Sequence, residues 1–303
     1  MTRLRAAVPG DAQALTALRA AVHPYAVTGV EATRRALEAP RGSSAFWVAV
    51  EGGEVTGSAS ASPGPELGDV AVQVHPRRRG HGTGSALLAA AVGHLAGARR
   101  LRAFADAADL GFARRHGFEP GREVRYAARS LAEPLPAPDP GTRTVSLRRV
   151  DARELYEADV AARADEPDDV AAAAVTYETW RSGVHDNPDL DLDLSTAALA
   201  GGGIAAFTLV LRHGDRIWSD MTATLPRYRR RGLAYQVKTV ALSRAAAAGV
   251  AVAYTSTDGS NVPMLAVNDR LGYRPVASRF ACLTPPRRPP AGEGGGGLSA
   301  VAT

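Results

Sequence analysis

Two segments of the chain combine arginine with small residues in a spacing suited to holding an anion. The first runs from Arg79 to Gly84 (RGHGTG), and the second runs from Arg229 to Ala234 (RRRGLA), 150 residues later. Each lies between a predicted strand and a predicted helix, so successive backbone N–H groups would gather at the positive end of the helix dipole. Small residues at the fourth and sixth positions leave the main chain open to a phosphate. The residues predicted to hold the ligand are Arg79, Gly80, Gly82, Gly84, Thr224, Arg229, Arg230, Arg231, Gly232, Leu233 and Ala234.

The spacing of these residues excludes two other phosphate-binding motifs. The chain has no Gly-Lys-Ser or Gly-Lys-Thr, which a P-loop requires, and its glycines lack the G-x-G-x-x-G spacing of a dinucleotide-binding turn. An ATPase and a dehydrogenase are therefore not expected. Binding of RNA through the arginines of 77–79 and 227–231 is an alternative. Apart from Tyr228, however, these segments lack the interleaved aromatic residues typical of RNA-binding proteins.

Both segments lie in the same series of predicted elements, which indicates an internal repeat. In each copy, a hairpin with a glycine-containing turn precedes the strand that leads into the arginine-glycine segment. A helix with apolar residues at spacings of three and four follows, then a strand, then a helix that ends at Gly117 or Gly272. The predicted strands are 46–50, 55–60, 70–74 and 101–105 in the first copy and 195–200, 204–211, 218–225 and 250–255 in the second.

A proline-rich segment between the copies marks a predicted domain boundary. Residues 131–143 carry four prolines at alternate positions, a pattern typical of an extended spacer. The sequence therefore predicts an N-terminal domain at 1–130 and a C-terminal domain at 144–283. Residues 284–303 are rich in proline and glycine, and they are predicted to form a disordered tail.

The composition is that of a folded protein with two domains. The chain has 303 residues, 45% of them hydrophobic and 22% charged. It has no apolar run typical of a signal peptide or of a membrane span, so neither export nor a membrane partner is expected. The single cysteine, Cys282, fits a reducing compartment, and the cytoplasm is predicted. The seven histidines lack the spacing of metal ligands, so no metal is expected.

With an arginine-glycine segment after a strand in each copy, the chain resembles the Gcn5-related N-acetyltransferase (GNAT) family, whose signature is Q/R-x-x-G-x-G/A. The resemblance covers about residues 3–128 and 145–282. It implies an α/β fold of two tandem GNAT domains, each with a central mixed sheet flanked by helices. It also implies that the amides of the two segments bind the pyrophosphate of acetyl-CoA and that a splayed pair of parallel strands admits the pantetheine arm. The implied reaction transfers the acetyl group of acetyl-CoA to the primary amine of a small molecule or a peptide.

The two copies are unequal around this implied site. Gly272 follows Pro226 by 46 positions, whereas Gly117 follows Pro76 by 41, so five positions are missing from the first copy. By resemblance, Asn261 and the helix after it line the cofactor and acyl site of the second copy, and the first copy has no such asparagine. The resemblance therefore implies a catalytic second half and a degenerate first half.

The residue that would protonate the leaving group departs from the family pattern. Many family members have a tyrosine four residues before the terminal glycine, where its hydroxyl protonates the CoA thiolate. Here the corresponding residues are Ala113 and Asn268. An amide such as that of Asn268 can donate a hydrogen bond but has no proton to transfer, so water or Tyr273 is an alternative general acid.

Asp220 is the candidate base or the anchor for the acceptor amine. It alternates with Thr222 and Thr224 on a predicted strand, so the three side chains would share one face. On a face that borders the cleft, the carboxylate could accept a proton or hold an ammonium group. A solvated surface carboxylate is the alternative interpretation. The candidate catalytic residues are therefore Asp220, Asn261 and Asn268.

The sequence leaves two aspects of the function open. A pseudoenzyme that binds acyl-CoA as a regulatory ligand without turnover is an alternative to the transferase. No portable motif identifies the amine acceptor, and the fold by itself does not supply one. The expected partner is a small-molecule or peptide amine rather than a nucleic acid, and an oligomer is compatible with the sequence.

Overall fold

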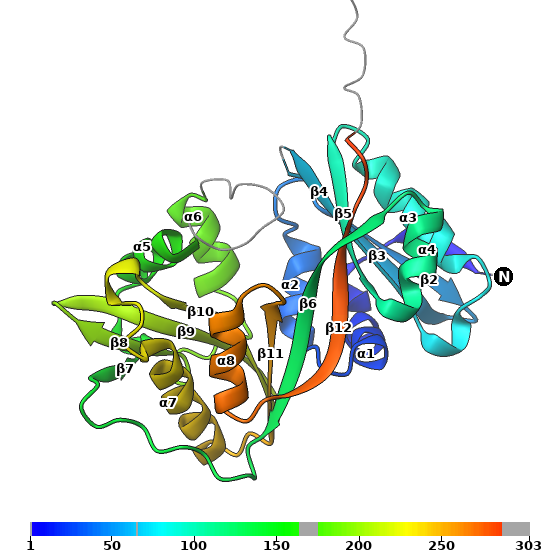
Figure 1. The fold of residues 1–303 in the computed structure, drawn as a ribbon. Coiled ribbons are helices and arrows are strands. Elements are labelled where there is room, and N and C mark those ends of the chain that lie inside the picture. The colour runs from blue at the N-terminus through cyan, green and yellow to red at the C-terminus, as the bar shows by residue number, and fades with distance from the viewer. Residues whose placement is uncertain (1, 65, 164–174, 287–303) are drawn as a thin grey trace, which may run out of the picture.

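The computed structural model describes residues 2–64, 66–163 and 175–286. The twelve strands of these segments form one mixed sheet in the order β1-β2-β3-β4-β5-β12-β6-β11-β10-β9-β8-β7, and helices pack against it (Figure 1). This confirms the predicted α/β class, with mixed sheets flanked by helices. The sheets of the two halves are joined edge to edge into one sheet.

The two halves have nearly the same succession of elements, as the internal repeat predicts. The first half contains β1 (Arg3–Ala6), α1 (Ala12–Val22), α2 (Val30–Glu38), β2 (Ala45–Glu51), β3 (Glu54–Ser62), β4 (Leu67–Val74), α3 (Thr83–His94), β5 (Arg100–Asp106), α4 (Leu110–Arg115) and β6 (Glu119–Ser130). The second half contains β7 (Thr144–Ser146), α5 (Ala152–Arg163), α6 (Tyr177–Trp180), β8 (Thr196–Ala200), β9 (Gly203–His213), β10 (Arg216–Thr224), α7 (Leu233–Ala247), β11 (Val252–Asp258), α8 (Val262–Arg270) and β12 (Arg274–Leu283).

The last strand of each half lies in the sheet of the other half. β12 pairs antiparallel with β5, residues 279–283 opposite 102–106. β6 pairs antiparallel with β11, residues 124–130 opposite 252–258. β6 and β12 also pair with each other, so the halves meet along these two strands at the centre of the molecule (Figure 1). The sheet is therefore continuous across the boundary that the proline-rich segment predicts.

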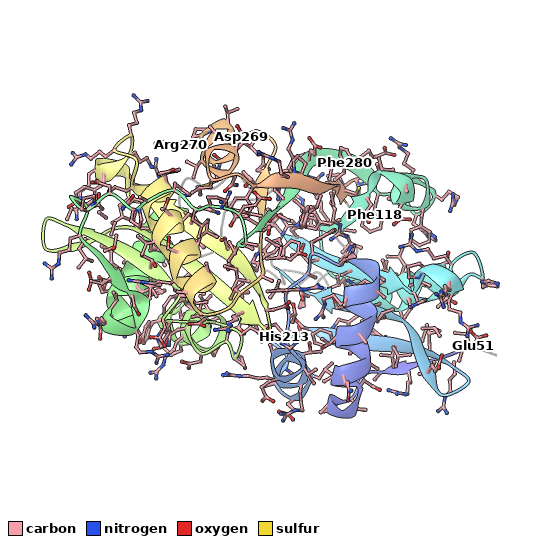
Figure 2. All side chains as sticks on the ribbon, turned by 90° about the horizontal axis from the view of Figure 1, so that it is seen from below. Glu51, Phe118, His213, Asp269, Arg270 and Phe280 are labelled. Carbon is pink, nitrogen blue, oxygen red and sulfur yellow. The ribbon has the colours of Figure 1, made fainter. Side chains whose placement is uncertain are left out.

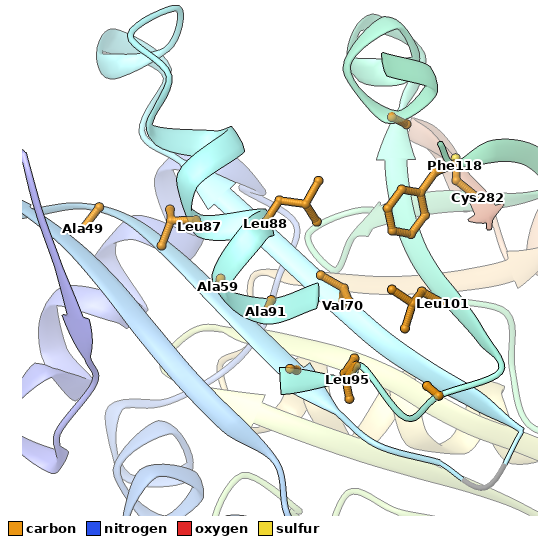
Figure 3. Close-up of a cluster of buried hydrophobic side chains, with 13 residues drawn as sticks. Ala49, Ala59, Val70, Leu87, Leu88, Ala91, Leu95, Leu101, Phe118 and Cys282 are labelled. Carbon is orange, nitrogen blue, oxygen red and sulfur yellow. The ribbon is translucent and has the colours of Figure 1, made fainter. Parts of the chain in front are cut away.

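The exchanged strand also supplies side chains to the core of the first half. Cys282 of β12 is buried in the cluster that contains Leu101 and Phe118 (Figure 3). Phe280 of the same strand packs against this cluster and lies near Phe118 (Figure 2). Burial raises the pKa of the Cys282 thiol, which keeps it protonated at neutral pH and suits a packing role.

In the second half, α7 is the helix that positions the candidate site. It packs against β8, β9 and β10. Val237, Ala241 and Ala245 are fully buried along it, and their spacing of four residues places them on one face. The same helix buries Lys238, whose exposed fraction is 1%.

The linker and the start of the predicted tail both contact the folded part of the chain. Within the linker, the carbonyl of Asp139 accepts a hydrogen bond from Gln236 Nε2 at 3.1 Å. Thr284 is buried, and its hydroxyl accepts the backbone N–H of Leu101 at 2.9 Å. Thr284 therefore belongs to the folded part of the chain, although the disordered tail was predicted to begin at this residue. Residues 287–303 of the predicted tail lie outside the described residues.

Candidate functional site

The two arginine-glycine segments form the same kind of turn. After β4 and after β10, a short 3-10 turn leads to a glycine at the N-cap of a long helix. Gly82 caps α3 with φ +79°, and Gly232 caps α7 with φ +75°, a left-handed conformation that favours glycine. The N–H groups in the first turn of a helix have no partner within that helix. A Cβ on Gly232 would meet no atom within 4 Å, so the space beside these N–H groups is open.

The turn in the second half keeps its shape at some cost in backbone strain. Arg230 has φ +62°, whereas its counterpart in the first half is Gly80, with φ +83°. The left-handed region costs a non-glycine residue about 1–2 kcal/mol. The two turns therefore share a backbone conformation rather than residue types.

The strands that lead into each turn separate from their parallel neighbours. β10 and β11 pair only over 216–219 and 252–255, although both continue for several residues beyond. β4 and β5 pair only over 67–69 and 100–102. A bulge in β10 between Ser219 and Thr222 accompanies the separation in the second half. Each half therefore has a V-shaped gap between parallel strands, as the resemblance implies.

A cavity of about 510 Å³, referred to below as the second-half cavity, lies beside the turn of the second half, between β10 and α8. Met221 and Ala223 of β10 line it on one side, and Pro263 and Val267 of α8 line it on the other. Arg231 is outside this lining, and its guanidinium lies 5.6 Å from the ring centroid of Tyr228. The predicted ligand residues that do line the cavity are Thr224, Arg229, Arg230, Gly232, Leu233 and Ala234.

The first half has a cavity of comparable size, about 460 Å³. Its lining includes His23 from the end of α1 and Phe112 from α4. Burial, together with nearby arginines, lowers the pKa of His23 to about 4, so this imidazole is neutral at pH 7. The predicted ligand residues of the first copy that line this cavity are Arg79, Gly80, Gly82 and Gly84.

A third cavity, of about 410 Å³, lies between the two halves and is referred to below as the inter-half cavity. The first half contributes Arg102 and Phe104 from β5 and Arg122 and Tyr126 from β6. Because β6 lies in the sheet of the second half, its side chains reach the V formed by β10 and β11. The second half contributes Trp218, Asp220, Met221, Thr222, Lys238, Thr255, Ser256, Thr257, Asp258, Asn261 and Met264.

An ion pair between the halves lies in the wall of the inter-half cavity. The guanidinium of Arg122 donates to the carboxylate of Asp258 at 2.8 Å. Burial alone would raise the pKa of Asp258, but hydrogen bonds from Ser260 and from Arg122 lower it below its ordinary value. Asp258 is therefore an anion at neutral pH, and its charge is already compensated by Arg122.

Asp220 lies in the lining of the inter-half cavity, at the bulge of β10. The side chain is exposed, and it interacts with another group of the protein. The bulge lies between Ser219 and Thr222, so it interrupts the regular alternation that was predicted for Asp220 and Thr222. Thr222 lines the inter-half cavity as well, whereas Thr224 lines the second-half cavity.

The two candidate asparagines lie in different environments. Asn261 is the N-cap of α8, and its side-chain oxygen accepts the N–H of Met264 at 3.2 Å. It lines both the second-half cavity and the inter-half cavity. Asn268 is buried and donates to Thr257 Oγ1 at 2.9 Å, and it lines neither of these two cavities. This hydrogen bond joins α8 to β11.

Tyr273, the alternative general acid, is also outside both linings. Its exposed fraction is 2%, and its hydroxyl is 3.1 Å from Ser219 Oγ. Burial raises the pKa of Tyr273 to about 12, so the phenol stays protonated at neutral pH. Tyr273 is therefore buried next to Ser219, at the point where β10 and β11 separate.

Lys238 is the residue of the inter-half cavity that sequence reasoning missed. Its Nζ donates to Thr255 Oγ1 at 3.5 Å and lies 5.1 Å from the ring centroid of Tyr273. Burial lowers the pKa of Lys238 to about 7. One signal was present in the sequence, because Lys238 is the only lysine among 36 basic residues and lies next to the apolar face of a helix.

The lowered pKa of Lys238 makes stability depend on pH. In the unfolded chain Lys238 keeps its proton up to about pH 10.5, whereas in the folded protein it loses the proton near pH 7. Between these values the unfolded state binds more protons, so the free energy of unfolding is expected to rise with pH by up to about 1.4 kcal/mol per unit. Urea unfolding at pH 7, 8 and 9 measures this rise. The variant Lys238→Met should lack it, and identical slopes in both proteins would contradict the assigned shift.

Two kinds of feature are absent from residues 2–64, 66–163 and 175–286. No helix in these ranges is long and apolar enough to cross a membrane. No group of three or more histidine, cysteine, aspartate or glutamate side chains in the same ranges is arranged to hold a metal ion.

Comparisons with known proteins agree with the fold. Residues 42–120 match the acetyltransferase (GNAT) domain, and this segment lies in the first half. A mycothiol acetyltransferase from Nocardioides sp. is 34% identical over 142 residues, which are 45% of this chain and 48% of that protein. The aligned segment thus spans about half the length of this curated relative.

Solved structures match almost the whole chain. A GCN5-related N-acetyltransferase from Sphaerobacter thermophilus has a TM-score of 0.72 at 23% identity, covering 93% of this chain and 95% of that one. A tandem GNAT protein from the clavulanic acid biosynthesis pathway has a TM-score of 0.67 at 19% identity, covering 93% of this chain and 98% of that one. At this identity the likeness shows the fold, which is that of two tandem GNAT domains. The domain match at 42–120, the curated relative and the tandem fold together support a GNAT family member.

Proposed function

We propose that the protein is an N-acetyltransferase that transfers the acetyl group of acetyl-CoA to a primary amine, with the chemistry in the second half. One observation carries this proposal. The second-half cavity, which has the phosphate-binding turn, and the inter-half cavity, which has the charged groups, share Met221, Thr222, Asn261 and Met264. A donor in the first of these cavities and an acceptor in the second would therefore meet at the bulge of β10.

The residues of the second-half cavity fit acetyl-CoA. The open space beside Gly232, the free amides of the first turn of α7, and Arg229 and Arg230 suit a pyrophosphate. The apolar side chains of Met264 and Val267 suit the pantetheine arm. Acetyl-CoA supplies the acetyl thioester. The single cysteine is buried, which fits a reducing compartment, and we place the reaction in the cytoplasm.

The inter-half cavity supports an amine acceptor of small size. Asp220 is suited to hold an ammonium group, and Tyr126 and Trp218 offer aromatic faces whose ring centroids are 6.0 Å apart. Arg102 and Arg122 add guanidinium donors to the lining, and each is also ion-paired, with Asp69 and with Asp258 respectively. The acceptor proposed is therefore a small molecule or a peptide terminus that carries a primary amine together with polar groups.

The test of the proposed function is release of CoA thiol. Purified full-length protein would be incubated with acetyl-CoA and with single amines from a panel of amino acids, aminosugars, polyamines and peptides. Thiol release that depends on one class of amine is expected, and mass spectrometry should find the acetylated amine. Binding of acetyl-CoA without amine-dependent thiol release would support the alternative, a pseudoenzyme that uses acyl-CoA as a regulatory ligand.

The substitution Asp220→Asn is expected to lower kcat/KM for the amine by about 100-fold, mainly through a higher KM. The amide keeps the shape of the side chain but cannot form an ion pair with an ammonium group, which is worth about 1.5–3 kcal/mol. Steady-state kinetics with the best acceptor measures the change. Asp269→Asn is the matched control, because this carboxylate is on the exposed side of α8 with a side-chain exposure of 86% (Figure 2). A near wild-type KM for Asp220→Asn would mean that the carboxylate plays no part in binding the amine.

A further inference from the structure

Lys238 lies at the fork where the two splayed strands of the second half separate. Ser219 and Thr255 are the last paired residues of β10 and β11, and Thr255 is the residue to which Lys238 Nζ donates. The lysine reaches this point from α7 and lines the inter-half cavity. We propose that Lys238 accepts the proton that the acceptor ammonium must lose before it can attack the thioester. This inference rests on the proposed function and assigns one of its proton-transfer steps.

The contacts of Lys238 leave its amine short of the partners that an ammonium ion needs. An ammonium has three donors, and the hydrogen bond of Nζ to Thr255 Oγ1 is long, at 3.5 Å. The hydroxyl of Thr255 donates its own proton to the carbonyl of Ser219 at 3.1 Å, so toward Nζ it acts as an acceptor. Burial is the cause of the lowered pKa of Lys238, and no carboxylate contributes to the shift. A buried lysine in such surroundings is stable as the neutral amine, which has a lone pair to accept a proton.

The charged groups around Lys238 lie on the walls of the inter-half cavity rather than against Nζ. β5 and β6 contribute Arg102 and Arg122, β10 contributes Asp220 and β11 contributes Asp258. Tyr126 of β6 faces the same cavity, and Tyr273, which follows α8, faces Lys238 from below. Of the strands packed against α7, β8 has no ionisable side chain, and β9 has Arg212 and His213 at its far end.

The pKa of Lys238 then follows from burial and not from a neighbouring charge. Burial lowers this pKa to about 7. A base is most effective when its pKa lies near the working pH, because it is then unprotonated and still strong enough to take a proton. Lys238 meets this condition at neutral pH, and its position at the fork places it beside the bulge of β10, where the two cavities join.

The proton balance of the reaction gives Lys238 a defined task. A primary amine enters as R–NH₃⁺, and transfer of one proton to the neutral Lys238 breaks an N–H bond of the acceptor and forms an N–H bond at Nζ. The freed lone pair of the acceptor forms the C–N bond of the amide while the C–S bond of the thioester breaks. Lys238 returns its proton to the departing thiolate, and the attacking nitrogen loses a second N–H proton to water. Each turnover therefore converts R–NH₃⁺ and the thioester into an amide, a thiol and one proton in solution, and it leaves the lysine neutral.

The first test compares two substitutions and their pH profiles. Lys238→Met keeps the length and apolar character of the side chain, whereas Lys238→Arg keeps a cation that cannot lose its proton. Both variants are expected to lose about 100-fold or more in kcat, the usual range for a positioned base. In the wild type, kcat/KM for an amine of pKa 9 or above should fall on the acidic side of about pH 7. In Lys238→Met that limb should be absent, and the rate should follow the ionisation of the amine. Retained activity in Lys238→Arg would overturn the proposal.

The second test needs no turnover and no variant. Because Lys238 is the only lysine of the chain, protein grown with lysine carrying ¹³C at Cε gives one lysine signal in an NMR spectrum. Titration of that signal should show a midpoint near pH 7 in the native protein and a midpoint near 10.4 in the urea-unfolded chain. A midpoint above about 9 in the native protein would overturn the inference, since the lysine would then be charged at working pH.

These measurements separate this inference from the proposed function. A wild type that releases no thiol with any amine overturns the transferase proposal and, with it, the role of Lys238. A wild type that turns over, with both lysine variants equally active, overturns the role of Lys238 alone. Thermal melts of the two variants check that they fold, and the wild-type titration remains decisive if they do not.

Discussion

The substitution Gly232→Glu is expected to abolish binding of acetyl-CoA to the second half and, with it, turnover. The added carboxylate would lie at the N terminus of α7, where it would compete with the pyrophosphate for the same amides and repel it. The left-handed φ of +75° at this position adds strain for any residue with a Cβ, on the order of 1–2 kcal/mol. Isothermal titration calorimetry with acetyl-CoA should show a loss of affinity of more than about 100-fold, equivalent to roughly 2.7 kcal/mol.

Two control variants separate the causes of this loss. Gly232→Ala introduces the same backbone strain without a charge, and nothing lies within 4 Å of the new Cβ, so binding should weaken only slightly. Gly82→Glu makes the matched change at the N-cap of α3 in the first half, where φ is +79°. It should spare most of the turnover if the first half is degenerate. Loss of turnover in Gly82→Glu together with normal turnover in Gly232→Glu would mean that the chemistry is in the first half.

Separating the halves is expected to unfold both of them. A fragment of residues 1–143 lacks β12, so β5 loses its neighbour and the first-half core loses Cys282 and the packing of Phe280. A fragment of residues 144–303 lacks β6, so β11 loses its pairing over seven residues and becomes an unpaired edge. A typical domain is stabilised by only about 5–15 kcal/mol, so loss of a whole strand and of its core side chains is expected to unfold each fragment. Circular dichroism and thermal melts of each fragment should show no cooperative transition.

Cleavage of the linker in the intact protein tests the same exchange of strands. A protease site inserted in the linker at 136–138, between the halves, should be cut without dissociation, because the exchanged strands hold the two pieces together. After denaturation in urea, the mixed pieces should refold and co-elute, whereas each piece alone should not. A fragment of residues 1–143 that folds by itself, with a melting transition like that of the intact protein, would contradict the structural importance of the exchange.

Much of the fold and of the two arginine-glycine turns could be predicted from the sequence, because the signals are local. A glycine or alanine at a fixed place after a strand determines a backbone conformation within a few residues, and Gly82 and Gly232 both adopt it. Periodicity likewise predicted the strands and helices on either side. Repetition of the same pattern at an offset of 150 residues then predicted two tandem units, which the fold confirms.

The candidate site beyond these turns could not be predicted, because it depends on contacts between distant segments. A regular strand was predicted at Asp220, whereas a bulge interrupts β10 at this residue. The bulge depends on the pairing of β10 with β9 rather than on local residue types. The position of Asn268 in the motif did not predict that the residue is buried or that it donates to Thr257 Oγ1.

By itself, the sequence determined the α/β class, the repeat, and the two turns with their arginines and glycines, since each depends on short-range geometry and on the period of apolar residues. Only the tertiary structure decided that the last strands are exchanged, because nothing local in β6 or β12 specifies which edge it joins. The tertiary structure also decided that the pKa of Lys238 is lowered. A lysine on a helix is ordinarily solvated, and the pKa of this one falls only because α7 packs against the sheet and excludes water from its side chain.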